Sequence, residues 1–310
     1  METSIQVSVI SNPGLIRSNN EDNFYIDGTY MKEKDRDNGA LNVIKETKPH
    51  HLIAVFDGMG GEELGELASI TAVRSLSHMD QQLAKAPVDR PLHDKQDEIK
   101  AFVNDTNDMI CSLIEQHGKV RMGTTASCLY LYGDRGMVFH LGDSRIYRFR
   151  DGMLEQLTSD HTEAQRLVRL GVLSEAQAQK HRSRHQLTRH FGVFPQEGII
   201  EADISQEFHV YESDIFLLCS DGLTDMISDD DISAALRGNV DIAKTNYSLL
   251  RQALDKGGHD NITSLLVKVD GIGDKKVKSS SESVLRSILD KLYKYNKYDR
   301  GEKECKMQGM

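Results

Sequence analysis

The stretch from residue 51 to 69, HLIAVFDGMGGEELGELAS, constrains the fold of this chain more than any other. It opens with an apolar run, Leu52–Phe56, that has the length of a buried strand. Asp57 follows at once, and glycines at positions 58, 60 and 61 let backbone carbonyls and amides approach a bound group closely. A carboxylate and carbonyls at a sheet edge suit a hard cation. Taken alone, the motif is equally well explained as a strand followed by a Gly-rich turn.

Five further acids stand beside predicted strands or turns. Glu21 and Asp22 are adjacent in GLIRSNNEDNFYI, so in an extended chain their side chains point to opposite faces. Asp143 follows a predicted strand at 137–141, Asp221 follows one at 215–219, and Asp260 precedes one at 264–269. Carboxylates, backbone carbonyls and water are the ligands that Mg²⁺ and Mn²⁺ prefer. Spacing alone does not show that these acids converge, because isolated Asp residues at turns are ordinary.

The acids would support phosphoryl chemistry if they met in one place. Two divalent ions about 3.5–4 Å apart can bind one water between them, lower its pKa and direct it at a phosphorus atom. Arg17 lies four residues before Glu21, and a nearby guanidinium can hold phosphoryl oxygens through two parallel hydrogen bonds.

Apolar periodicity predicts the remaining elements. Ile5–Ile10 alternates as a half-buried strand does. Helical spacing covers Leu64–Leu83 and about Asp97–Gln116, with Met109 on the apolar face of the second helix. Two shorter helices are expected at about 229–237 and 241–256, and the polar residues 28–50 are expected to form a surface loop. The globular part is expected to end near Asp270.

Two segments differ in composition from the rest. Residues 160–198 are rich in His, Arg and Gln, and a segment of this length between strands predicts a flap beside the site. Its histidines, at 161, 181, 185 and 190, lack zinc-site spacing and are expected to be surface or phosphate-contacting groups. The tail, 271–310, has ten Lys and Arg against six Asp and Glu, with a helical apolar stripe from Val284 to Leu292. Docking on the body and contact with a partner or membrane surface both remain open for it.

Bulk properties exclude several classes of function. The net charge of −10 argues against a broad grip on nucleic acid. The four cysteines contain no CxxC pair, which fits a reducing compartment better than a disulfide scaffold. The chain contains no apolar run of about 18 residues, the length that a membrane-spanning helix needs. We therefore expect a cytoplasmic monomer that does not bind nucleic acid and does not cross a membrane.

Six motifs in order resemble one known family. RSNNED, FDGMGGEELGELAS, GTTA, LGDSRIYR, SDGLTD and GGHDNIT look like the successive motifs of the metal-dependent protein Ser/Thr phosphatases, the protein phosphatase 2C (PPM) family in its bacterial form. The resemblance implies an α+β fold: a central β-sandwich of two antiparallel sheets with helices outside each sheet, in four layers α-β-β-α. It implies a catalytic domain over residues 1–270, followed by the basic, partly helical tail.

The resemblance also implies a binuclear Mn²⁺ or Mg²⁺ centre. Asp57 would bridge the two ions, and Asp221 and Asp260 would hold the first of them. Glu21, largely through water, and the carbonyl of Gly58 would hold the second. The implied reaction is hydrolysis of phosphoserine and phosphothreonine by water, on proteins phosphorylated by a cognate Ser/Thr kinase.

Other positions carry over with more open roles. Asp143, together with Asp221, resembles a pair that binds a third, weaker ion in bacterial members. Arg17 matches the arginine that binds the substrate phosphate. Asp22 would support the metal ligands without binding an ion itself, and Asn261 would order the turn that presents Asp260. Met59 stands where many eukaryotic members have a His proposed as the general acid, so the resemblance leaves the general acid unassigned.

Two alternatives to a protein phosphatase remain. A catalytically weak family member could act as a scaffold in phospho-signalling, and a hydrolase of small phosphoesters could use the same ions. A Cys-based phosphatase is excluded because Cys128 and Arg135 are separated by six residues rather than the five that such enzymes need.

Overall fold

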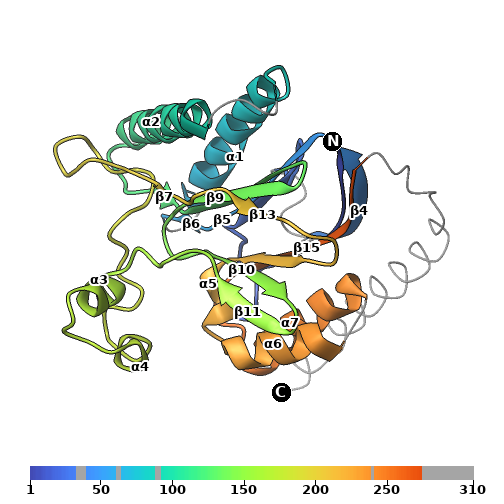
Figure 1. Cartoon of the computed structure of the whole chain (residues 1–310). Helices are drawn as coiled ribbons and strands as arrows, with labels where there is room; N and C mark the ends of the chain where they lie inside the picture. Colours follow the sequence, from blue (N-terminus) through green and yellow to red (C-terminus); the bar gives the residue numbers. More distant parts are fainter. Residues whose placement is uncertain (33–39, 61–63, 88–91, 239–240, 274–310) are drawn as a thin grey trace, which may run out of the picture.

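The computed structural model describes residues 1–32, 40–60, 64–87, 92–238 and 241–273. Two antiparallel sheets face each other, and each is covered on its outer face by helices, so the predicted four-layer α+β sandwich is confirmed (Figure 1). The first sheet has the order β11-β10-β14-β15-β1-β4. Its strands are β1 (Thr3–Asn12), β4 (Ala40–Lys48), β10 (Arg145–Arg150), β11 (Met153–Gln156), β14 (Ile215–Cys219) and β15 (Ile262–Ile272).

The second sheet has the order β12-β9-β8-β5-β2-β3, with β13 also paired to β9. Its strands are β2 (Asn23–Ile26), β3 (Thr29–Tyr30), β5 (His50–Phe56), β8 (Ala126–Tyr132), β9 (Arg135–Leu141), β12 (Asp203–Ile204) and β13 (Phe208–His209). Two short strands, β6 (Gly58–Met59) and β7 (Gly123–Thr124), form a separate pair beside the end of β5.

Helices close both outer faces. The second sheet is covered by α1 (Leu64–Leu83) and α2 (Leu92–Gln116), and the first by α5 (Asp221–Thr224), α6 (Asp229–Gly238) and α7 (Ile242–Asp255) (Figure 1). Two further helices, α3 (Glu163–Arg169) and α4 (Glu175–Ala178), lie to one side of the sandwich. None of the helices in the described ranges is long and apolar enough to cross a membrane.

The apolar run of β5 is explained by burial on both faces of its sheet. Ile53 and Val55 point into the core between the sheets, where they meet Val7 of β1. Ala54 and Phe56 point the other way, into the core beneath α1 and α2. A strand in this position is apolar at every residue rather than at alternate ones, because neither face meets water.

The structure corrects three sequence predictions. The expected loop at 28–50 contains β3 and β4, and β4 pairs with β1 along its length. Because β4 lies at the edge of its sheet, its polar and charged residues are compatible with a strand. The second helix begins at Leu92 rather than near Asp97, and Met109 is 41 % exposed while its neighbour Ile110 is buried.

The division into domains stays a prediction. The last described strand, β15, runs to Ile272, close to the predicted end of the globular part. Gly61 of the Gly-rich motif and the predicted helical stripe of the tail lie outside the described residues.

Candidate active site

A cavity of about 740 Å³ opens at the end of the sandwich where β5, β9 and β14 finish and β15 begins. The predicted metal and phosphate ligands all lie in its wall, although they come from segments spread over 240 residues. Its lining consists of Ile16, Arg17, Ser18, Asn19, Glu21, Asp57, Gly58, Met59, Gly60, Thr125, Asp143, His185, Leu187, Asp221, Asp260 and Asn261. The convergence that spacing could not establish is therefore present in the fold.

Asp57 is held in place by Thr124, the last residue of β7, and by Thr125, which directly precedes β8. Its backbone N–H donates to Thr125 Oγ1 at 3.0 Å, and its carbonyl accepts from Thr125 N and Thr124 Oγ1, each at 2.9 Å. Gly58 follows in β6, where any Cβ would collide with the carbonyl oxygens of Gly65 and Glu21. Glycine at position 58 thus lets the loop that carries Glu21 lie directly against Asp57.

Asp143 and Asp221 enter the cavity from the two sheets. Asp143 follows β9 through Gly142, whose φ of 112° is a conformation that suits glycine. The hydroxyl of the next residue, Ser144, hydrogen-bonds to the hydroxyl of Thr125 at 2.7 Å. Thr125 therefore contacts both the turn that carries Asp143 and the turn that carries Asp57. Asp221 is the first residue of α5 and follows Ser220 at the end of β14.

Asn261 organises the loop that bears Arg17 and Glu21. Its Oδ1 accepts from the N–H of Glu21 at 2.7 Å, and its Nδ2 donates to the carbonyls of Pro13 and Asn19 at 3.1 and 2.8 Å. The neighbouring Asp260 accepts a hydrogen bond from Arg17 Nη2 at 2.8 Å. Asn261 therefore fixes the loop of residues 13–21 in addition to lying beside Asp260.

The cluster of carboxylates is crowded and short of positive charge. Burial raises the pKa of Asp57 well above its usual range, and Asp22, Asp221 and Asp143 raise it further. Burial, with Asp225 and Asp260 nearby, raises the pKa of Asp221 to about 6. Such shifts mean that the ionised forms lack compensation by the protein itself.

Divalent cations would supply the missing positive charge. The cavity offers side-chain carboxylates and the carbonyl of Gly58, an all-oxygen donor set that fits Mg²⁺ or Mn²⁺ rather than a thiolate-bound metal. The residues present therefore fit the predicted ions.

Asp22 lies behind the cavity and not in its wall. It is buried, and its Oδ2 accepts from Ser220 Oγ at 2.7 Å. Burial raises its pKa to about 7. Ser220 in turn accepts from the N–H of Thr263, so the hydroxyl ties β2, β14 and β15 together immediately before Asp221.

Sequence reasoning missed the roles of Ser220 and Thr125. Both stand inside motifs quoted above, SDGLTD and GTTA, but their hydrogen bonds reach residues far away in the chain. A hydroxyl directly before or within such a motif is the only signal that the sequence offers.

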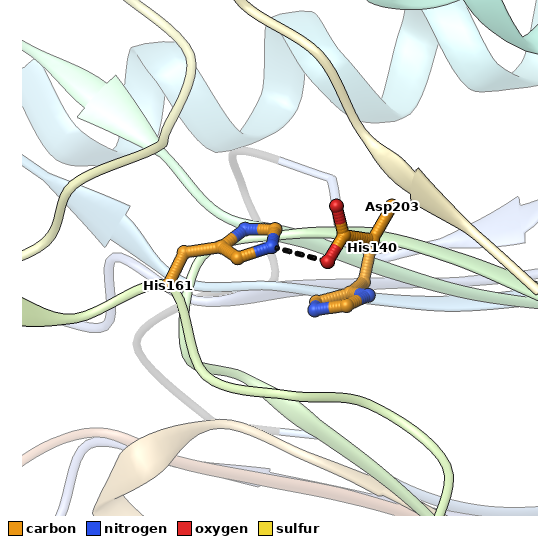
Figure 2. Close-up of side chains that lie close together, drawn as sticks. All are labelled: His140, His161 and Asp203. Carbon is orange, nitrogen blue, oxygen red and sulfur yellow. Dashed lines mark ion pairs between the residues drawn. The ribbon is translucent and has the colours of Figure 1, made fainter. Parts of the chain in front are cut away.

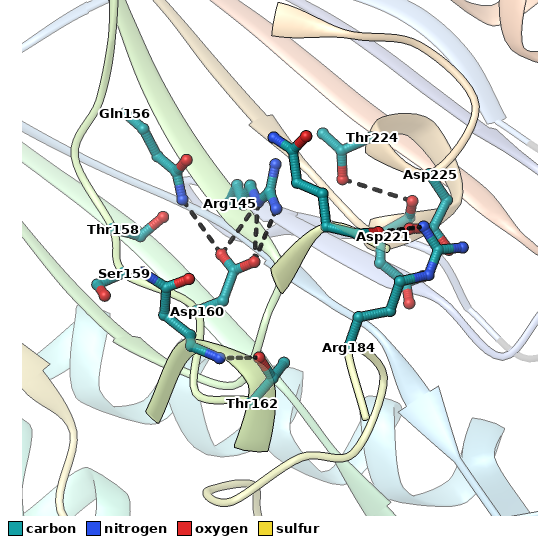
Figure 3. A network of polar contacts seen from close by, with 12 residues as sticks. Arg145, Gln156, Thr158, Ser159, Asp160, Thr162, Arg184, Asp221, Thr224 and Asp225 are labelled. Carbon is teal, nitrogen blue, oxygen red and sulfur yellow. Dashed lines mark hydrogen bonds and ion pairs between the residues drawn. The ribbon is translucent and has the colours of Figure 1, made fainter. Parts of the chain in front are cut away.

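The flap packs against the site at its base. Arg145, two residues after Asp143, forms a bidentate ion pair with Asp160, which also accepts from Gln156 (Figure 3). Further along, Arg184 points towards Asp225, with 3.8 Å between Nη2 and Oδ2 (Figure 3). Asp160 lies near enough to Asp143, and Asp225 near enough to Asp221, for each to raise the pKa of that predicted metal ligand.

The flap histidines do not share one environment. His185 lines the cavity, with Nδ1 3.8 Å from Asp221 Oδ2, and is half-exposed as predicted. The expectation is wrong for His161, which is fully buried and stacks on His140 with ring centroids 4.4 Å apart. His161 is buried because its backbone and ring both hydrogen-bond to the Gly142 turn.

Comparison with known proteins identifies the family. The sequence model of the family described as protein phosphatase 2C matches residues 18–262. The chain belongs to the protein phosphatase 2C family. The resemblance inferred from the six motifs is thereby confirmed.

Bacterial Ser/Thr phosphatases are among the relatives of this protein phosphatase 2C domain. It is 33 % identical over 263 residues to the serine/threonine protein phosphatase PstP of Mycobacterium tuberculosis, a match that spans 84 % of this chain and 44 % of PstP. The chain thus spans less than half the length of PstP. It is 31 % identical over 248 residues to the phosphatase stp of Listeria monocytogenes, covering 80 % of this chain and 95 % of stp.

Solved structures of the family share the fold. The crystal structure of PstP superposes with a TM-score of 0.70 at 31 % identity, covering 86 % of this chain and 100 % of that one. The structure of the Streptococcus agalactiae phosphatase has the same TM-score at 30 % identity and the same coverage. The PstP catalytic domain in complex with two manganese ions superposes with a TM-score of 0.67 at 31 % identity, over 87 % of this chain and 100 % of that one.

Proposed function

We propose that this chain is a metal-dependent protein phosphatase that hydrolyses phosphoserine and phosphothreonine in proteins. One observation carries the proposal: five acids from separate segments, together with Arg17, converge on one cavity. These acids are Glu21, Asp57, Asp143, Asp221 and Asp260. The names of PstP and stp as Ser/Thr phosphatases support the substrate class.

The proposed metal ligands follow from the family and from the position of each group. Asp57, whose pKa is raised by burial and by its acidic neighbours, would bridge two Mn²⁺ or Mg²⁺ ions. Asp221 and Asp260 would hold the first ion, and Glu21 and the Gly58 carbonyl the second. When bound, such a pair of ions lowers the pKa of a water and orients it towards phosphorus. The structure of the PstP catalytic domain in complex with two manganese ions supports a centre of two ions.

The chain's own groups would position the phosphoryl group. The Arg17 side chain is 53 % exposed at the cavity and is bonded to Asp260, so it can turn from that carboxylate to phosphate oxygens. Met59 lines the cavity but carries no exchangeable proton, so the leaving oxygen must receive its proton from another group. Asp143, with Asp221, would hold a third ion more weakly.

Partners and location belong to the same proposal. The substrates would be proteins phosphorylated by a cognate Ser/Thr kinase, and the enzyme would act as a cytoplasmic monomer. The free, buried thiols of Cys111, Cys128 and Cys219 are compatible with a reducing compartment.

A phosphothreonine peptide assay with Mn²⁺ tests the proposal. Phosphate release should occur with Mn²⁺, stop with EDTA and be lost in Asp57→Asn, which removes a negative charge shared by two ions. Acid quenching should trap no phosphoenzyme. Turnover that survives EDTA, or an active Asp57→Asn, would refute the mechanism.

The same assay separates the two alternatives. A small aryl phosphate with a higher kcat/KM than the peptide would favour a small-phosphoester hydrolase. Peptide binding without turnover, with Mn²⁺ bound in calorimetry, would favour a signalling scaffold.

A further inference from the structure

His161, at the base of the flap, is joined to the turn that carries Asp143. The backbone N–H of Gly142 donates to His161 Nδ1 at 3.1 Å, and the backbone N–H of His161 donates to the carbonyl of Gly142 at 2.9 Å. His161 is fully buried. Both polar groups of Gly142, the residue directly before Asp143, are therefore satisfied by one residue of the flap base.

The ring of His161 has a defined tautomer. Because Nδ1 accepts a hydrogen bond, the proton of the neutral imidazole lies on Nε2. Nε2 faces Asp203 Oδ2 at 3.1 Å, as Figure 2 shows, but makes no hydrogen bond of regular geometry to any described residue. Burial and the adjacent His140 lower the pKa of His161 to about 4, which keeps the ring neutral and its Nδ1 an acceptor.

This tautomer excludes a metal site at the cluster of His140, His161 and Asp203, although their ligand atoms lie within 4.8 Å of one another. An ion on Nε2 of His161 would require that nitrogen to lose its proton while Nδ1 still accepts from Gly142. Arg189 also balances the charge of Asp203, whose Oδ1 accepts from Arg189 Nη1 at 2.6 Å. We interpret His140 and Asp203 as residues that fix the orientation of the His161 imidazole.

The turn of Gly142 and Asp143 is held from two sides. On one side, the hydroxyls of Thr125 and Ser127 hydrogen-bond to the hydroxyl and the carbonyl of Ser144. Gly142 has a φ of 112°, and a Cβ there would lie 2.5 Å from Thr125 Cγ2, so one side of the turn is pressed against the residue that supports Asp57. His161 holds the other side. Asp143 itself is buried and crowded by Asp221, which raises its pKa beyond the effect of burial.

We propose that His161 is a positioning residue for Asp143, acting through the hydrogen bond from the Gly142 N–H to its Nδ1. The inference rests on the proposed function, in which Asp143 helps to hold the third, weak ion. His161 is also joined to the C-terminal part of the flap, because its carbonyl accepts a hydrogen bond from the N–H of Thr188 at 2.7 Å. The base of the flap and the weak ion site then share one hydrogen-bonded residue.

Two isosteric variants separate the two sides of the ring. In His161→Asn, the amide oxygen can take the place of Nδ1 and accept from Gly142, since both atoms lie two bonds from Cβ. In His161→Gln, the amide reaches only the place of Nε2 and can face Asp203, so the Gly142 N–H loses its acceptor. Each variant keeps a buried amide, and each is therefore the control for the other.

Calorimetric titration of Mn²⁺ into the metal-free full chain, without substrate, gives the decisive readout. His161→Asn should bind the same number of ions as the wild type. His161→Gln should keep the tight steps and lose about 10- to 100-fold in the affinity of the weakest, as is usual when the partner of a metal-binding group is removed. The Mn²⁺ concentration for half-maximal phosphopeptide turnover should rise in His161→Gln only.

The outcomes that overturn the inference are distinct. Wild-type binding of only two ions, equal weak-step affinities in all three proteins, or loss of the weak step or of the fold in His161→Asn would each refute it. Because calorimetry uses no substrate, a wild type that binds three ions but hydrolyses no phosphothreonine refutes the proposed function alone. Normal turnover and normal Mn²⁺ dependence in His161→Gln refute the positioning role alone.

Discussion

Replacing Asn261 by Ala should destabilise the catalytic domain by an amount that its contacts allow to be worked out. The side chain is 6 % exposed and forms three hydrogen bonds to backbone groups, those of Glu21, Pro13 and Asn19. At about 1 kcal/mol for each bond lost, the free energy of unfolding should fall by about 3 kcal/mol. For a domain of this size, the melting temperature should fall by about 6–12 °C.

The measurement is differential scanning calorimetry of the metal-free protein in EDTA, so that lost ion binding does not add to the effect. Asn261→Asp is a more specific test. Its second carboxylate oxygen cannot donate a hydrogen bond and would face the carbonyl oxygens of Pro13 and Asn19, so this variant should be at least as unstable as the alanine variant. Asn42→Ala is the control: Asn42 is exposed on β4, and its loss should cost under about 0.5 kcal/mol. If Asn261→Ala melted no lower than Asn42→Ala, the account of the 13–21 loop would be wrong.

Three further predictions concern the site and its surroundings. Asp143→Ala should keep the fold and the two tight Mn²⁺ steps in calorimetry but lose most turnover of phosphopeptides; an unchanged number of ions with only a lower melting temperature would make Asp143 a turn residue. Arg17→Ala should mainly raise KM, because an Arg that binds phosphate equally in the ground and transition states supplies uniform binding, and steady-state kinetics showing a collapse of kcat at constant KM would contradict this. The pKa of His161 is lowered to about 4 from an ordinary 6.5, so between these pH values the unfolded state binds a proton that the native state does not. The free energy of unfolding should therefore fall as pH falls through this interval. Urea unfolding of the metal-free protein at pH 7 and pH 4.5 should show a loss about 2–3 kcal/mol larger in the wild type than in His161→Asn, and equal losses would refute the assignment.

Local patterns in the sequence determined much of the architecture. The apolar face of α1 predicted that helix, Leu64–Leu83, at both ends. The apolar run of β5 and the Asp-Gly that follows it placed a carboxylate at a sheet edge before any contact was known. Hydrophobic periodicity and turn chemistry depend on neighbouring residues only, so a single chain shows them directly.

The tertiary structure decided which of the acids meet and what holds them. Asp57 and Asp143 rest on Thr125, and Asn261 reaches Glu21 across 240 positions in the chain, contacts that no local pattern contains. The strand β4 went unrecognised because an edge strand can be polar and is defined by its partner, β1, rather than by its own residues. The burial of His161 was missed for the same reason: a histidine in a polar segment becomes a core residue only when a distant turn, here at Gly142, accepts and donates its hydrogen bonds.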